Sequence, residues 1–159
     1  MKCYSIILLL FCSFFSHGQV NSANIKIDSI TSFQLVREKF NPEINKLEIK
    51  NGFVLGINDS PLFGSDGEIP KYKLIKATLK IKDKSYNLQV DNMYNPWTGD
   101  QLNVNFFKII HSGENHHLLK CIFSDGAGSY SAYWKIEEKS SKREILSNDE
   151  KYFEWQLEN

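Results

Sequence analysis

Alternation of apolar and polar residues runs through most of the chain, and it constrains the fold more than any other sequence feature. It is clearest at residues 77–81, where Ala77, Leu79 and Ile81 alternate with polar side chains. Similar runs span residues 47–49, 53–57, 86–90, 102–111, 117–123, 130–136 and 153–157. Because successive side chains of a strand point to opposite faces of a sheet, this period predicts strands with one buried face. No helical segment is long enough for the crossovers that a parallel sheet needs.

Short polar turns separate these runs. Asn51-Gly52 lies between two alternating segments, which is the strongest short signal for a β-hairpin because both central residues need a positive φ. Asp83-Lys84 and residues 112–115 supply further turns. Strands about a dozen residues apart with turns between them are typical of an antiparallel β-sandwich. We therefore predict an all-β, single-domain antiparallel β-sandwich with mostly hairpin-connected strands, and a β-barrel as the alternative.

Some segments depart from the simple pattern. Leu74-Ile75 shifts the phase of the alternation and predicts a β-bulge. Residues 106–110 are apolar on both faces, which favours a central strand covered on both sides. Residues 32–40 fit either a helix or an edge strand, and residues 147–152 fit a helical turn. The basic stretch at residues 139–143 is interpreted as a solvated connection.

The N-terminus has the three-part layout of a secretory signal peptide. Lys2 gives a positive start, residues 6–15 are almost wholly apolar, and Ser16-His17-Gly18 places small residues at a cleavage site. The apolar run is too short to span a bilayer. We expect removal of residues 1–18, export to the periplasm or the extracellular space, and one domain over residues 19–159. No later segment is apolar enough to predict stable insertion into a membrane.

Charge and cysteine content narrow the classes of partner. Removal of Lys2 leaves 18 of the 19 basic residues against 19 acidic ones, so the exported charge is near −1 (18 minus 19). Nucleic acid and anionic membranes select a basic excess, so neither is expected as a partner. Cys121 is the single cysteine of the exported region, which predicts no internal disulfide. Its apolar neighbours predict a buried structural residue.

Strand direction predicts which connections share an end of the sheets. Antiparallel strands reverse at every connection, so alternate connections lie at the same end. The turns at residues 51–52, 83–84 and 112–115 are assigned to one end. Longer loops at residues 58–70, 91–101 and 124–128 are assigned to the other, and they contain most of the unusual aromatic and acidic residues. Since function concentrates on loops held by a rigid scaffold, the candidate ligand-binding residues are Tyr94, Trp97, Asp100, Asp66 and Asp125.

Trp97 has two interpretations at this stage. It can close the open end of the sandwich as an apolar plug, or it can face solvent as a platform for a ligand. Base rates favour the plug, because open ends of sandwiches need apolar covering. The acids around it suggest Ca²⁺, with ligands from residues 65–68 and Asp125-Gly126. No contiguous loop has regular ligand spacing, so no cofactor is expected, with Ca²⁺ as the exception to test.

Other reactive motifs are weak. His116 and His117 are neighbours on a strand and point to opposite faces, so they do not readily chelate one ion, although His111 lies across the turn. Residues 125–129 contain glycines and a serine but precede a strand, unlike a nucleophile elbow, which opens a helix. We interpret Gly126 and Gly128 as residues of positive φ in a turn.

These features predict a secreted or periplasmic non-catalytic binding module. The aromatic and acidic loop end would bind a glycan, a peptide or a protein. An envelope inhibitor or immunity-type protein that acts through a protein interface is the alternative. A carboxylate-dependent hydrolase that uses the loop acids is the second alternative, because paired carboxylates can support glycoside hydrolysis.

Overall fold

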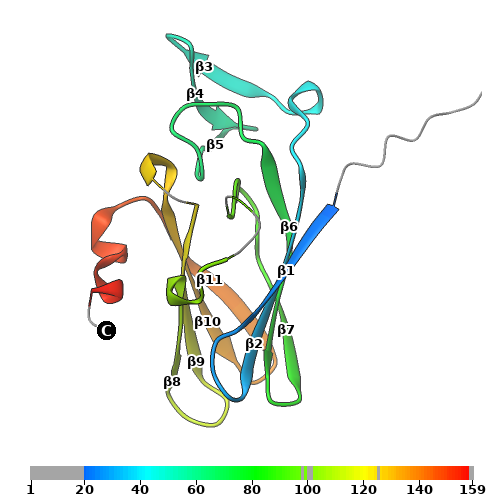
Figure 1. Ribbon diagram of the computed structural model, residues 1–159, viewed down its shortest axis with the longest axis vertical. Helices are drawn as coiled ribbons and strands as arrows, with labels where there is room; N and C mark the ends of the chain where they lie inside the picture. The colour runs from blue at the N-terminus through cyan, green and yellow to red at the C-terminus, as the bar shows by residue number, and fades with distance from the viewer. Residues whose placement is uncertain (1–19, 98, 100–101, 125, 158–159) are drawn as a thin grey trace, which may run out of the picture.

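A computed structural model describes residues 20–97, 99, 102–124 and 126–157, and within them the protein is all-β (Figure 1). The first sheet has the order β1-β2-β6-β7, and the second has the order β11-β10-β9-β8. A small third sheet has the order β3-β4-β5. Every strand pairing is antiparallel. The expected signal peptide, residues 1–18, lies outside the described residues.

The elements have the following bounds. The first sheet contains β1 (Val20–Lys26), β2 (Thr31–Lys39), β6 (Tyr72–Ile81) and β7 (Lys84–Leu88). The second contains β8 (Phe107–His111), β9 (His117–Phe123), β10 (Tyr130–Glu137) and β11 (Ser140–Ser147). The third contains β3 (Leu47–Lys50), β4 (Phe53–Ile57) and β5 (Ser60–Pro61). Short 3-10 helices are η1 (Pro42–Ile44), η2 (Val104–Phe106), η3 (Gly126–Gly128), η4 (Glu150–Tyr152) and η5 (Glu154–Gln156).

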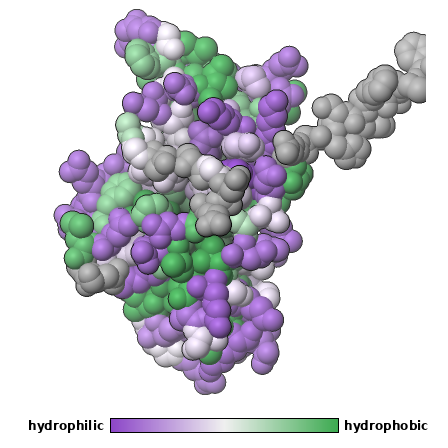
Figure 2. Space-filling model, in the orientation of Figure 1, coloured by the Kyte–Doolittle hydropathy of each residue, from purple (hydrophilic) through white to green (hydrophobic). Residues whose placement is uncertain are grey.

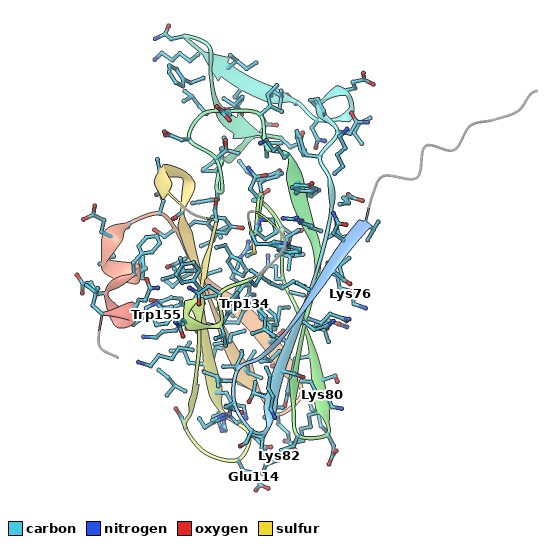
Figure 3. All side chains as sticks on the ribbon, viewed as in Figure 1. Lys76, Lys80, Lys82, Glu114, Trp134 and Trp155 are labelled. Atoms are coloured by element: carbon cyan, nitrogen blue, oxygen red, sulfur yellow. The ribbon has the colours of Figure 1, made fainter. Side chains whose placement is uncertain are left out.

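The two four-stranded sheets pack face to face around one apolar core, which confirms the sandwich. Trp134 of β10 lies between them and is fully buried (Figure 3). Its Nε1 donates a hydrogen bond of 3.0 Å to the carbonyl of Gln89 just after β7, which ties the second sheet to the first. Ser141 of β11 adds a 2.7 Å bond to the carbonyl of Asn87. The sheets of the described residues do not close into a barrel, so that alternative is wrong.

The third sheet projects beyond one end of the sandwich (Figure 1). Asn51 and Gly52 have φ values of 52° and 85°, as expected for the predicted two-residue hairpin between β3 and β4. A second apolar cluster of Phe40, Val54, Ile57 and Tyr94 holds this sheet to the chain below it. The hairpin therefore lies at the same end as the long loops. It does not lie at the end of the turn between β6 and β7, which is formed by residues 82–83 rather than by Asp83-Lys84. The assignment of Asn51-Gly52 to the opposite end is wrong, because these strands leave the main sheets.

Two further sequence predictions are resolved in the first sheet. The register between β2 and β6 shifts at Val36 and Arg37, so that Ile75 is the extra residue of the predicted bulge. Most of residues 32–40 belong to β2 (Thr31–Lys39), which lies between β1 and β6 and is therefore a central strand. Neither the helix nor the edge strand considered for this segment is correct.

The second sheet also differs from the sequence prediction. Residues 104–106 form η2, in which the side chain of Asn103 accepts a hydrogen bond from the amide of Asn105. The strand begins only at Phe107, and β8 lies at the edge of the sheet with Ile110 exposed. The central position predicted for residues 106–110 is therefore wrong. Apolar residues on both faces do not require a central strand when one face is left to solvent.

The C-terminal region differs from the sequence prediction in two places. Residues 139–143 are not only a solvated connection, since most of them belong to the edge strand β11, whose charged side chains suit an exposed edge. Residues 153–157 do not form a last strand, because residues 154–156 form η5. The carbonyl of Tyr152 accepts hydrogen bonds from the hydroxyls of Ser131 and Tyr133 on β10. These bonds replace strand pairing and hold the C-terminal segment against the second sheet.

Cys121 is buried in the core, and burial raises the pKa of its thiol well above the usual value. Its structural role therefore agrees with the sequence prediction. Within the described part of the chain, no helix is long and apolar enough to cross a membrane.

Two histidines join the sheets at the end opposite the long loops. His111 and His117 are opposite each other in the β8–β9 pairing, and their Nδ1 atoms lie 2.8 Å apart. The Nε2 of His111 lies 3.0 Å from a carboxylate oxygen of Asp28, which follows β1. The chain of contacts from Asp28 to His117 thus connects the first sheet to the second.

This arrangement predicts a fall in stability at mildly acidic pH. Burial lowers the pKa of His117, and the nearby charges of His111, His116 and Lys82 lower it further. An unfolded histidine has a pKa of about 6.5, so the unfolded state binds the proton first as the pH falls. The contribution of His117 to the free energy of unfolding is therefore complete above about pH 6.5. It is lost as the pH falls through the lower pKa of His117 in the folded state. Urea unfolding from pH 7.5 to pH 5 should show this decline.

His117→Gln should flatten the decline. His116→Gln, at an exposed neighbouring position, removes one of the smaller causes of the lowered His117 pKa and should keep most of the decline. An unchanged pH dependence in the His117 variant would show that this contact does not control stability.

Candidate functional site

The three long loops predicted to share an end are in contact, and Asn95 joins the first two. Its Oδ1 accepts hydrogen bonds from the amides of Lys71 and Tyr72 at 2.9 and 3.0 Å. Its Nδ2 donates to the carbonyl of Gly64 at 2.7 Å. One amide side chain thus fixes the loop before β6 against the loop after β7.

The third loop, after β9, packs against both of the others. The amide of Ser124 donates a 3.3 Å hydrogen bond to the carbonyl of Pro96. Gly128 lies so close to Ser65 that a Cβ there would fall 2.9 Å from the Ser65 nitrogen. Gly126 has a positive φ of 64°, as predicted, but Gly128 does not. Gly128 is needed for close backbone approach and not for the conformation that the sequence suggested.

A cleft of about 930 Å³ opens where these loops meet the start of β1. This volume lies near the upper end of the usual range for ligand pockets. The side chains that argue for a polar ligand come from β1, the loops and β6: Ser22, Asp66, Glu68, Lys71, Tyr72 and Trp97. Both signs of charge are present, so the cleft offers donors and acceptors and does not select a uniformly charged ligand.

Arg37 forms the inner wall of the cleft and is 6% exposed. Its guanidinium lies between the rings of Tyr72 and Trp97, 4.0 Å from each centroid. Its Nη1 donates to the carbonyl of Trp97, and its Nη2 donates to the carbonyl of Gly99 at 3.4 Å. Cation–π contacts and hydrogen bonds to charged donors both strengthen when water is excluded. Arg37 therefore fixes the loop that carries Trp97.

Sequence reasoning did not select Arg37, although a signal was present. Phe33, Leu35 and Arg37 alternate along β2, and all three are buried on the core side. A charged residue at a core-facing position needs compensating partners. The core-facing position of Arg37 follows only if residues 31–39 form a strand, and the sequence left that assignment open.

Trp97 and Tyr94 point inward. Trp97 is 6% exposed and belongs to the main core, so its interpretation as a plug is correct, although the residue is also among those that line the cleft. Tyr94 is buried in the second cluster, where its ring meets Phe40 edge-to-face at 5.5 Å, and burial raises its pKa. Its carbonyl accepts a 3.0 Å hydrogen bond from the hydroxyl of Tyr130. Tyr94 thus stabilises the loops through its buried contacts and does not line the cleft.

The structure describes only some of the acidic residues predicted for the site. Asp66 and Glu68 are exposed and line the cleft, and the Ser65 hydroxyl donates a 2.7 Å hydrogen bond to the Glu68 carbonyl. Asp100 and Asp125 lie outside the described residues. Among the residues that are described, no three His, Cys, Asp or Glu side chains form a group that could hold a metal ion. Ca²⁺ therefore remains a prediction from the sequence.

The carboxylate-dependent hydrolase remains a prediction from the sequence. Among the described residues, Asp66 and Glu68 place carboxylates at the cleft, and both are exposed.

Fold and cleft together define a class of protein: an antiparallel β-sandwich with a small projecting sheet and a polar cleft between loops. No protein-family model matches the chain, and no significant match was found among curated proteins or among solved structures. The function of the protein is therefore inferred from the geometry of the cleft.

Proposed function

We propose that this protein is an exported binding module that takes a polar ligand, a glycan or a short peptide, in the cleft between its three loops. The observation that carries the proposal is the cleft itself, which three separate loops build on a rigid sandwich. Residues with hydroxyl, carboxylate, ammonium and guanidinium groups line it, together with Tyr72 and Trp97. Such a lining suits ligands that combine hydroxyl or amide groups with flat apolar faces.

Arg37 supports this proposal by its position. The stacked guanidinium holds the Trp97 loop and the start of β6 together, so the cleft is formed before a ligand arrives. A preformed site loses less conformational freedom on binding, which favours affinity. Binding at this site is expected to need no rearrangement of the sheets.

Glycan and peptide arrays followed by calorimetry of the bound compounds test the proposal. Asp66→Ala combined with Lys71→Ala removes one charge of each sign from the cleft and should weaken binding at least about tenfold, the effect of losing roughly 1.4 kcal/mol of contacts. Both residues are exposed, so the variant should keep the thermal stability of the wild type within about 1 kcal/mol.

Lys142→Ala combined with Glu144→Ala is the matched control, because it removes the same charges from the exposed face of β11. This control should bind as the wild type does. Equal losses in both variants, unchanged binding in the cleft variant, or a lack of any bound glycan or peptide would contradict the proposal.

A protein interface of the inhibitor or immunity type is the second candidate. The projecting β3–β4 hairpin favours it, because Phe53 and Leu55 are exposed there and do not line the cleft. Exposed apolar side chains gathered on one element are typical of interaction surfaces. A protein ligand whose affinity is lost in Phe53→Ser but kept in the cleft variant would support this candidate over the first.

A further inference from the structure

The outer edge of β3 has no partner strand among the described residues. The third sheet has the order β3-β4-β5, so β3 is an edge strand. In a hairpin with a two-residue turn, the flanking pair, here Lys50 and Phe53, exchanges its backbone hydrogen bonds. The next residue, Ile49, then directs its N–H and carbonyl away from β4. An exposed edge of this kind is a template for another strand.

Apolar side chains accompany this edge. Ile49 and Phe53 are each 58% exposed, and Figure 2 shows hydrophobic surface on the projecting sheet. Native proteins usually protect an exposed edge by short length, charge or a covering loop. Here the edge is short, carries charges and has a register shift against β4 between Glu48 and Ile49. The charges are nevertheless arranged to match those of a second copy.

Glu48 and Lys50 lie on either side of Ile49. Neither side chain is in an ion pair within the described part of the chain, whereas neighbouring Lys46 is paired with Asp59. If a second copy pairs antiparallel about a two-fold axis at Ile49, Glu48 lies opposite Lys50 of the second copy, and Lys50 lies opposite its Glu48. Ile49 then meets Ile49 of the second copy. Opposite charges and apolar pairs at such positions stabilise a sheet.

The register centred on Leu47 also opposes unlike charges, Lys46 and Glu48. However, Lys46 is already paired with Asp59, and Leu47 packs against the second apolar cluster. A two-fold axis at Glu48 would place that carboxylate opposite itself and would place Lys46 opposite Lys50 of the second copy. Like charges directly opposite each other destabilise strand pairing. Charge pairing and the exposure of Ile49 together favour the register centred on Ile49, in which the outward backbone groups of Ile49 can also bond to each other across the axis.

We propose that two copies of this chain associate by antiparallel pairing of their β3 edges, centred on Ile49. The third sheet then continues across the two-fold axis, a closed and symmetric arrangement. The association does not depend on the cleft or on its ligand. It would present two clefts on one particle, which raises avidity for a repetitive ligand.

Sedimentation equilibrium of the purified protein at low ionic strength tests the proposal. The contact is small, so the wild type should show a concentration-dependent monomer–dimer equilibrium with a Kd of roughly 10 μM to 1 mM. Glu48→Lys and Lys50→Glu each place like charges opposite one another twice and should raise Kd at least about tenfold. Equal amounts of the two variants should form a heterodimer, and the double variant E48K/K50E should restore the homodimer.

Glu144→Lys is the matched control, because it makes the same charge change on an exposed strand of the second sheet and should leave the dimer intact. All variants should keep the thermal stability of the wild type, since the substituted side chains are exposed. The proposal is overturned if the wild type stays monomeric up to about 1 mM, if the single charge reversals dimerise like the wild type, or if their mixture forms no heterodimer.

Discussion

Replacement of Trp134 by alanine is expected to lower the free energy of unfolding by about 3–5 kcal/mol, the range for a large aromatic residue removed from a core. The side chain is fully buried between the two sheets, where it meets Phe123 edge-to-face with ring centroids 6.3 Å apart. The substitution leaves a cavity and also removes the donor to the carbonyl of Gln89. Urea unfolding followed by circular dichroism measures the change. Against a total stability of about 5–15 kcal/mol for typical proteins, this loss brings the domain close to unfolding.

Trp155→Ala is the control for this prediction, because it removes a second buried tryptophan from a different part of the fold. Trp155 is also buried, but it belongs to the C-terminal η5 and donates its hydrogen bond to the nearby carbonyl of Tyr152 (Figure 3). A terminal segment can detach while the sheets stay folded, so its loss should cost less than that of Trp134. Equal losses in the two variants would contradict the view that the core between the sheets carries the stability.

The different surroundings of Trp134 and Trp155 also show which parts of the fold the sequence could predict. Alternation identified most strands, because burial of one face of each strand dominates their energetics. It failed at residues 153–157, where Phe153 and Trp155 alternate with polar residues but form 3-10 turns. A short segment with a buried tryptophan can satisfy the same pattern in either conformation. The choice depends on hydrogen bonds to β10, which no local pattern encodes.

The candidate site was predicted only in outline. Strand direction correctly brought three loops together, although it placed the Asn51-Gly52 turn at the wrong end. The parts that organise the cleft were not predicted: Asn95 acts through its side-chain amide, and Arg37 comes from a strand that reads ambiguously. Both residues act through contacts between segments far apart in the sequence. Such contacts follow from packing rather than from composition or spacing.

The cleft thus depends on close backbone contact between loops as much as on its lining. Gly64 lies at the centre of this contact, with a φ of 87°. A Cβ at this position would fall 1.9 Å from the carbonyl oxygen of Tyr94 and 2.6 Å from its carbonyl carbon. Those atoms belong to the backbone of the next loop, so they cannot move aside as a flexible side chain can. The loops must separate, or the substituted chain must refold locally.

Gly64→Ala should therefore lower the free energy of unfolding by more than about 3 kcal/mol, the upper end of the cost of backbone strain alone. It should also shift the NMR signals of Tyr94 and Asn95. Gly52→Ala is a matched control, because Gly52 has nearly the same φ, 85°, and a Cβ added there would meet no atom within 4 Å. It carries the conformational strain without the clash, and should cost about 1 kcal/mol. If the two variants lose the same stability, the strain and not the loop contact limits this position, and the close packing beneath the cleft is dispensable.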